Sequence, residues 1–213
     1  MRKDAVIFHL VIWSLALLAM PAAALAQGER VRFIHEPWSG QTDAQTEQGQ
    51  FEPSTPGYCF ENCETWIISY SAAYTGEALD QGITLSYNRF LVDDIEWFLE
   101  GGLWSFYDQG ADNAFGLSAS LGFRWHFLKN EDWSLFADIG IGVLGTTDHV
   151  PTDGTSFNFM PRAGVGFTRE IDENIRLMGG IRWHHISNAR TRGDSRNPSR
   201  DAPQIYVGLV VPF

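Results

Sequence analysis

After residue 26, the sequence lacks an apolar run long enough to cross a membrane as a helix. No segment there has the roughly 18 unbroken apolar residues that such a helix needs. Basic residues are also few. Lys and Arg number 15 against 26 Asp and Glu, which gives a formal net charge of −11. This charge argues against a nucleic-acid partner.

Cysteine is nearly absent as well. The chain has two cysteines, Cys59 and Cys63, in the stretch Cys-Phe-Glu-Asn-Cys. In an exported protein, a disulfide that closes this small loop is the favoured interpretation. The alternative is a metal site, but structural sites usually use four Cys or His ligands and only acidic residues lie nearby. We therefore expect a disulfide, and neither a metal nor a cofactor.

The N-terminus predicts export. Residues 1–26 read as a signal peptide, with a basic start, a mostly apolar stretch from Val6 to Met20 and an Ala-x-Ala cleavage signal at its end. A membrane anchor is the alternative, but the apolar run is short and stops at Pro21. Residues 27–63 predict an irregular periplasmic segment, because much of it is rich in Gln, Thr, Glu, Pro and Ser.

From residue 64 to residue 213 the sequence alternates with a period of two. Each of eight segments sets an apolar, aromatic face against a face of small and polar residues, as β-strands do. Each is near the 9–11 residues of a tilted strand that crosses a bilayer. The segments are Thr65–Tyr74, Ile83–Leu91, Ile95–Ser105, Ala114–Leu128, Trp133–Gly145, Ser156–Arg169, Asn174–Asn188 and Ala202–Phe213.

The polar faces distinguish a membrane barrel from a soluble sandwich. They are rich in Gly and Ser, which suits a cramped interior better than a solvated surface. They also carry charges of both signs, which a closed barrel must pair inside. The charged residues are Glu96, Glu100, Asp138, Arg124, Arg162, Arg176 and Arg182. The sequence thus predicts an all-β protein, an eight-stranded antiparallel transmembrane β-barrel of the outer membrane of a Gram-negative bacterium.

The connections between segments predict the orientation of this barrel. Three are short and acidic, and four alternating with them are longer. The short ones are 92–94, 129–132 and 171–173, and the longer ones are 75–82, 106–113, 146–155 and 189–201. Short periplasmic turns and long outer loops are the rule for such barrels. The seventh segment then rises to the outer leaflet, where its lipid-facing side carries His185 and Ser187.

His185 and Ser187 have the chemistry of a catalytic pair. A neutral imidazole within hydrogen-bond reach makes a serine hydroxyl a nucleophile, and a carboxylate can orient the imidazole. Asp201 is the predicted acid, because it starts the last strand with the same outward parity. The nearest oxyanion donor is the backbone N–H or side-chain amide of Asn188. The alternative is a polar fringe at the headgroup level, where such side chains are tolerated.

The adjoining loop is rich in arginine. Its four arginines are Arg190, Arg192, Arg196 and Arg200. Such a cluster suits phosphate or carboxylate groups. A simple solvated loop explains it equally well.

These residues resemble a known family. His185-Ile186-Ser187-Asn188, the later Asn197-Pro198 and the final strand are similar to the lipid A 3-O-deacylases (the PagL family), which are eight-stranded outer-membrane barrels. The resemblance implies His185 as general base, Ser187 as nucleophile and Asn188 as oxyanion contact. It also implies lipid A, within lipopolysaccharide, as substrate. The family's acid is a Glu at the start of the last strand, which is missing here, so Asp201 stands in as a hypothesis.

Substrate contacts and alternatives complete the prediction. Trp183, Arg190 and Arg192 are the predicted substrate-binding residues, and the protein is expected to be a monomer or weak dimer among outer-membrane lipids. A non-catalytic small barrel with a structural, adhesive or lipid-binding role is the main alternative. A phospholipase or acyltransferase of the same membrane surface is a further one.

Overall fold

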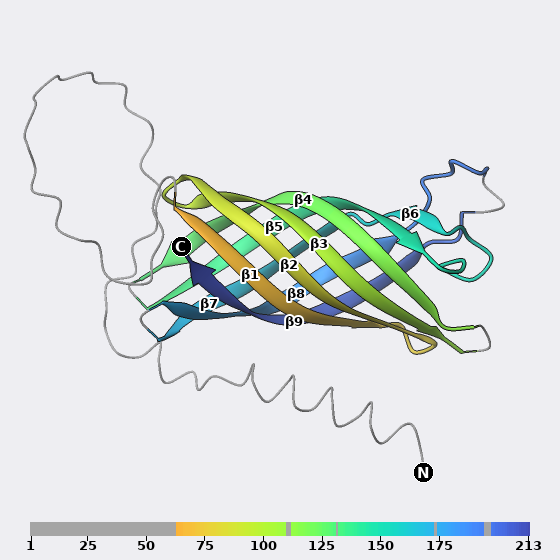
Figure 1. Ribbon diagram of the computed structural model, residues 1–213, viewed down its shortest axis with the longest axis horizontal. Coiled ribbons are helices and arrows are strands. Elements are labelled where there is room, and N and C mark those ends of the chain that lie inside the picture. Colours follow the sequence, from red (N-terminus) through yellow and green to blue (C-terminus); the bar gives the residue numbers. More distant parts are fainter. Residues whose placement is uncertain (1–62, 110–111, 131, 173, 194–196) are drawn as a thin grey trace, which may run out of the picture.

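The strands wind around one axis as a tilted barrel in the computed structural model (Figure 1). The structure describes residues 63–109, 112–130, 132–172, 174–193 and 197–213. Its strands are β1 (Glu64–Tyr74), β2 (Ala78–Val92), β3 (Ile95–Asp108), β4 (Ala114–Lys129), β5 (Trp133–Thr146), β6 (Phe157–Phe159), β7 (Arg162–Asp172), β8 (Ile175–Ile186) and β9 (Arg200–Pro212). No helix within these ranges is long and apolar enough to cross a membrane.

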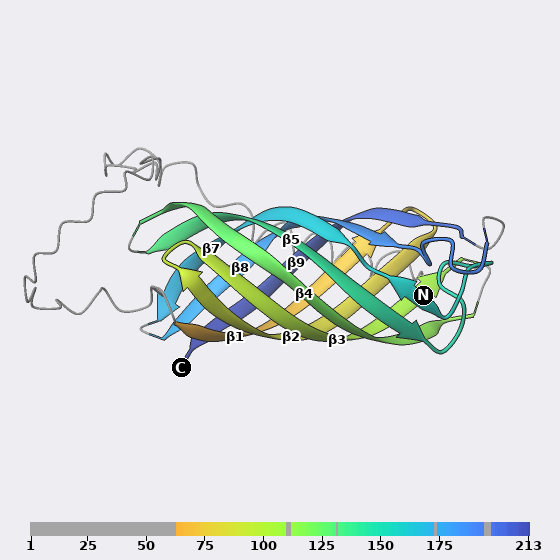
Figure 2. The same ribbon diagram turned by 90° about the horizontal axis from the view of Figure 1, so that it is seen from above.

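The barrel is closed, because β1 pairs with both β2 and β9 (Figure 2). All neighbouring strands in the described ranges are antiparallel. β6 and β7 are two parts of one strand, since both pair with β5 in the same register. Met160 and Gly142 exchange two backbone hydrogen bonds between these parts, of 2.8 and 3.1 Å. Pro161 has no N–H to donate, which interrupts the ladder there. The predicted eight-stranded antiparallel barrel is confirmed.

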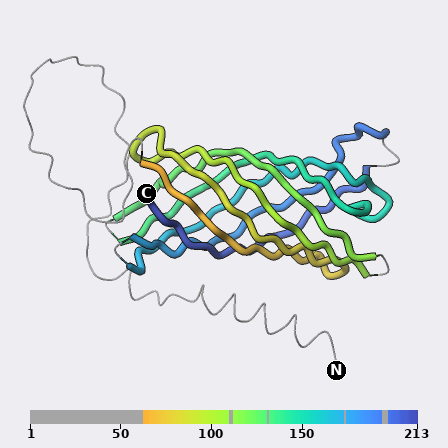
Figure 3. Tube along the Cα trace, viewed as in Figure 1, coloured from red at the N-terminus to blue at the C-terminus, as the bar shows by residue number. Residues whose placement is uncertain are grey.

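The connections fall into two groups at opposite ends of the barrel. The turn end has the short connections 93–94, 130–132 and 173–174, and the loop end has 75–77, 109–113, 147–156 and 187–199. Figure 3 shows the loop end opposite to the C-terminus. One predicted loop, 75–82, is wrong in extent, because β2 already begins at Ala78. Asp80 belongs to the strand because its buried carboxylate is ion-paired with Arg200 inside the barrel.

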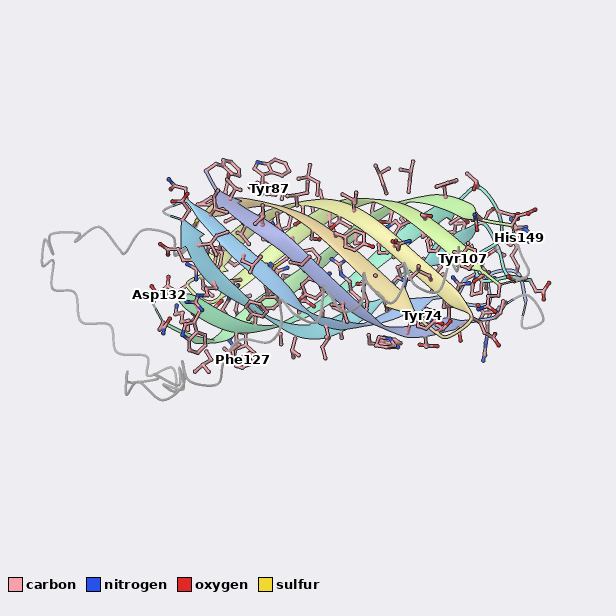
Figure 4. The ribbon with its side chains drawn as sticks, turned by 90° about the horizontal axis from the view of Figure 1, so that it is seen from below. Tyr74, Tyr87, Tyr107, Phe127, Asp132 and His149 are labelled. Carbon is pink, nitrogen blue, oxygen red and sulfur yellow. The ribbon has the colours of Figure 1, made fainter. Side chains whose placement is uncertain are left out.

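The outer surface of the barrel is apolar along the strands, as a lipid-facing wall requires. Aromatic side chains stand out from this wall near both ends. Figure 4 shows Tyr87 and Phe127 near the turn end, and Tyr74 and Tyr107 near the loop end. Such paired girdles mark the two membrane–water interfaces of a barrel.

The interior is filled by paired charges and aromatic rings. Arg124 is paired with Glu96, and Arg162 lies 2.5 Å from Glu100. Arg182 lies 2.8 Å from Asp138, and Arg176 lies 3.3 Å from Glu170. The guanidinium groups also cover rings, as when Arg182 lies 3.8 Å from the centre of the Tyr206 ring. The prediction that the barrel pairs both signs of charge inside is confirmed.

Several predictions fall on residues that the structure does not describe. They are the signal peptide (residues 1–26), the irregular segment (27–63, of which only Cys63 is described) and Cys59 of the predicted disulfide.

Candidate active site

His185 and Asp201 face each other across β8 and β9, near the loop end. They are direct partners in the antiparallel ladder, one rung before the pairing of these two strands ends at Ile186 and Arg200. The alternation of each strand puts both side chains on the outer wall, where Trp183 also lies. The parity that predicted Asp201 therefore holds in the structure.

A chain of short hydrogen bonds joins Asp201, His185 and Ser187. His185 Nδ1 lies 2.8 Å from Asp201 Oδ1, and His185 Nε2 lies 2.8 Å from Ser187 Oγ. An ionised carboxylate can only accept hydrogen bonds, so His185 Nδ1 carries a hydrogen and donates it in the bond to Asp201. Nε2 is then the acceptor of the Ser187 hydroxyl. This is the arrangement in which an imidazole can take a proton from a serine.

Ser187 lies one residue beyond β8, yet its backbone is fixed. Its N–H donates to the carbonyl of Phe159 at 3.2 Å, and the N–H of Phe159 donates back at 2.7 Å. The short strand β6 thereby extends the sheet to the serine. Ser187 is 8% exposed, so the hydroxyl sits in a protected position on the wall.

The carboxylate of Asp201 is held from two further sides. Trp183 Nε1 donates to Oδ1 at 2.8 Å, and Ser199 Oγ donates to Oδ2 at 3.3 Å. The Asp201 side chain is still 49% exposed, against 19% for His185. Trp183 was predicted as a substrate contact, and its bond to the acid is a role that the sequence did not indicate.

Asn188 follows the serine and turns away from the outer wall. Its side chain is buried, and its N–H donates to Asn197 Oδ1 at 3.1 Å. The backbone donor predicted for an oxyanion is therefore already engaged. The Asn197 side chain keeps its own N–H donors beside this bond, because its oxygen is the accepting atom. In the sequence, Asn197 stands out only as part of the Asn-Pro motif.

The predicted arginine cluster is divided by the structure. Arg190 lies in a sharp turn, with φ angles of 51° at Ala189 and 63° at Arg190. Arg192 lines a cavity of about 760 Å³ at the loop end, together with His149 and Phe157. Arg200 points inward from β9 and is buried, so it does not belong to the loop cluster. Arg196 lies outside the described residues.

An apolar groove lies below the His185–Asp201 rung, toward the middle of the membrane wall. It has a volume of about 550 Å³, and its outward-facing lining includes Ala163, Val165, Ile181, Trp183 and Pro203. Ala163, Trp183 and Pro203 form a rung across β7, β8 and β9 that lies two residue pairs further down and is the next one to face outward. The small Ala163 beside the large Trp183 makes the depression. The apolar groove thus lies on the turn side of the His185–Asp201 rung, and the cavity beside Arg192 lies at the loop end.

No group of three or more His, Cys, Asp or Glu in the described ranges is arranged to hold a metal ion.

Comparison with known families assigns the chain. Residues 81–210 match the family described as lipid A 3-O-deacylase (PagL). The chain belongs to this family. As a PagL-family barrel it is an outer-membrane protein of a Gram-negative bacterium. The search of curated proteins finds no match.

Three solved structures show the same fold as this PagL-family barrel. The outer membrane enzyme PagL aligns with a TM-score of 0.54 at 19% identity, over 69% of this chain and 99% of its own. The N-terminal β-barrel domain of Pseudomonas aeruginosa OprF has a TM-score of 0.54 at 16% identity, over 73% and 100%. Neisserial surface protein A (NspA) has a TM-score of 0.51 at 12% identity, over 71% and 96%. At these identities the likeness concerns the fold alone.

Proposed function

We propose that this protein is a serine esterase that removes the acyl chain ester-linked at the 3-position of lipid A. The observation that carries the proposal is the hydrogen-bonded row Ser187–His185–Asp201 on the lipid-facing wall. An imidazole between a hydroxyl and a carboxylate has little structural purpose on a surface that contacts lipid. Membership of the lipid A 3-O-deacylase family supplies the substrate class.

The first half of the reaction forms an acyl-enzyme. Ser187 Oγ attacks the ester carbonyl carbon while His185 Nε2 takes the hydroxyl proton. The tetrahedral intermediate then collapses, and the bond to the sugar oxygen breaks. His185 gives its proton to that oxygen, so the sugar leaves with a free hydroxyl. In the second half, water loses a proton to His185 and attacks the acyl-enzyme, which releases the fatty acid and restores Ser187.

Asp201 supports both halves of this reaction. Its carboxylate accepts the Nδ1–H of His185 and so holds the imidazole in the tautomer whose Nε2 is free to accept. The same negative charge stabilises the imidazolium that forms when Ser187 loses its proton. Trp183 and Ser199 fix the carboxylate by donating to its two oxygens. Asp in place of the family's Glu fits this geometry because Asp201 is the direct ladder partner of His185.

The negative charge of the tetrahedral intermediate needs hydrogen-bond donors. Asn188 was predicted for this role, and its N–H is bonded to Asn197. We assign the role to the Asn188–Asn197 pair, in which Asn188 fixes the Asn197 side chain and the Asn197 amide N–H donates to the oxyanion.

The surroundings of the row suit a lipid that stands in the outer leaflet. The apolar groove beside Trp183 lies toward the membrane centre, where the acyl chain of the substrate lies. The cavity lined by Arg192 lies on the loop side of Ser187, at the level of charged headgroups. Arg190 and Arg192 supply positive charge for the phosphate groups of lipid A. The ester bond between chain and headgroup then lies level with the serine.

Mass spectrometry of lipid A from cells that express the protein tests the proposal. Wild type is expected to remove the 3-position chain, and Ser187→Ala and His185→Ala are expected to abolish the loss. Ser105→Ala is the matched control, because Ser105 is another serine near the loop end, on the outward-facing side of β3. Unchanged lipid A with a folded wild-type barrel would favour the non-catalytic alternative. Loss of a chain from phospholipid instead would identify a phospholipase.

A further inference from the structure

The end of β9 that carries Asp201 is held by backbone pairing on one side only. The ladder between β1 and β9 ends at Ala73 and Gln204, whereas β8 pairs with β9 as far as Arg200. Residues 200–203 therefore have a paired edge toward β8 and an open edge toward β1. A polar cleft of about 460 Å³ lies at this place, and its lining includes Asp108, Arg200 and Asp201. The last rungs of a ladder open most easily, so this end needs another support.

The side chain of Arg200 crosses the open edge. It points into the barrel and is ion-paired with Asp80 on β2. Its Nη2 also lies 2.5 and 2.6 Å from the two carboxylate oxygens of Asp108, the last residue of β3. Thr152 of the neighbouring loop donates to Asp108 Oδ2 at 3.0 Å. Charged side chains thus join β9 to β2 and β3 where backbone hydrogen bonds to β1 have stopped.

His184 brings the other strand of the site into the same cluster. Its Nε2 lies 3.4 Å from Asp80 Oδ2, and its ring stacks on Trp104 with centroids 5.5 Å apart. His184 precedes His185, and Arg200 precedes Asp201. Because successive strand residues point to opposite faces, each outer member of the His185–Asp201 rung has an inner neighbour fixed in this cluster.

We propose that the Asp80–Arg200–Asp108 cluster positions Asp201 against His185 for the esterase reaction, an inference that rests on the proposed function. These three are positioning residues, because they act from inside the barrel and do not reach the substrate. Their effect is on the 2.8 Å contact between Asp201 and His185, which depends on the location of the β9 backbone. A displacement of about 1 Å in a catalytic group can lower a rate by about two orders of magnitude.

The test is a double-mutant cycle between Asp108 and Asp201. Asp108→Asn keeps the shape of the side chain and leaves Arg200 paired with Asp80. It is expected to lower kcat about tenfold with an unchanged KM, since it disturbs orientation and not substrate binding. The same change in an Asp201→Ala background is expected to have almost no further effect, because the side chain that it positions is then absent.

Glu96→Gln is the matched control. It also removes one carboxylate from a buried pair with an arginine, but near the turn end of the barrel. Its kcat is expected to stay within about twofold of wild type, as is usual for sites without shared partners. Equal losses from Asp108→Asn in both Asp201 backgrounds, or equal losses from Asp108→Asn and Glu96→Gln, would overturn the proposal.

Folding and function are separated by two further measurements. The folded fraction of each variant is followed by heat-dependent migration of the barrel on gels. If Asp108→Asn folds poorly, Thr152→Ala replaces it in the cycle and removes only one hydrogen bond to Asp108. A two- to threefold loss is then expected for the loss of one neutral-donor bond, and no loss refutes the idea.

The same double-mutant cycle is also measured without lipid A, with the rate at which a fluorophosphonate labels Ser187 as the readout. If wild type is labelled but leaves lipid A intact, the proposed substrate is wrong while the positioning role is still decided by the labelling rates. If the labelling rates show equal losses in both Asp201 backgrounds, the positioning role is wrong whatever the substrate.

Discussion

Replacement of Asp201 by Asn measures what the carboxylate contributes to the reaction. Asn has the same shape and can still accept a hydrogen bond from His185, so the change removes mainly the negative charge. The contact is a charge-assisted hydrogen bond of 2.8 Å in the structure. In a buried serine protease triad the same change lowers kcat about 10⁴-fold. The loss expected here is smaller, because in the protease the change also leaves the histidine in the wrong tautomer, which the Trp183 contact to the same oxygen prevents here.

The size of the effect follows from the hydrogen bonds that are exchanged. Bonds to charged groups contribute about 1.5–3 kcal/mol, and neutral ones about 1 kcal/mol. The difference of about 0.5–2 kcal/mol corresponds to about a 2- to 30-fold lower kcat. The assay is the initial rate of fatty-acid release from lipid A in detergent micelles.

In the Asp201→Asn variant, Trp183 determines the orientation of the introduced side-chain amide. Its indole N–H can only donate, and it lies 2.8 Å from the same oxygen that contacts His185. It therefore keeps the amide oxygen of Asn at that place and preserves the tautomer of His185. The double variant Trp183→Phe/Asp201→Asn frees the amide to rotate, and its loss is expected to exceed the product of the two single losses. A kcat within twofold of wild type for Asp201→Asn would refute the assignment of the acid.

Three further changes test the barrel and its groove. Gly122→Ala is expected to lower the urea midpoint of unfolding, because its new methyl group would lie 2.2 Å from a backbone oxygen, whereas Gly101→Ala, with its nearest atom at 4.0 Å, should not. Arg182→Met leaves the buried carboxylate of Asp138 without its closest partner and should destabilise the barrel by about 3 kcal/mol in the same urea titration. The double variant Arg182→Met/Asp138→Leu should recover most of this loss. Ala163→Leu partly fills the apolar groove and is expected to raise KM for lipid A while leaving hydrolysis of a short soluble ester unchanged, and equal effects on both esters would contradict the acyl-chain role.

The strands could be predicted because the two faces of each strand meet different surroundings. Lipid on one side and a cramped lumen on the other force a period of two, and the sequence displays it over almost the whole barrel. The start of β2 was missed because Asp80 and Gln81 look like loop residues. Asp80 is paired with Arg200, which follows it by 120 residues, and Gln81 accepts a hydrogen bond from Tyr70 on β1. No local pattern reveals such pairs. The assignment of Arg200 to a surface cluster failed for the same reason.

The site was predictable where it follows ladder geometry. His185 and Ser187 are one pleat apart, and Asp201 follows from the parity of the last strand. The bond from Asn188 to Asn197 was not predictable, because it joins residues nine positions apart in a segment whose sequence has no periodicity. The donation from Trp183 to Asp201 is diagonal between strands, so it depends on rotamers that alternation does not specify.

The location of the Ser187–His185–Asp201 row on the outer wall has a consequence for how the proposed esterase would meet its substrate. Nothing has to enter a mouth or cross a channel, because the lipid arrives by sideways diffusion within its own leaflet. The relevant concentration is then the fraction of lipid A among neighbouring lipids, and crowding of the leaflet governs encounter. Water is the scarce reactant at this depth, so release of the acyl chain from Ser187 depends on how far the row stands below the aqueous boundary. A thicker or more tightly packed outer leaflet should slow that second step before it slows the first.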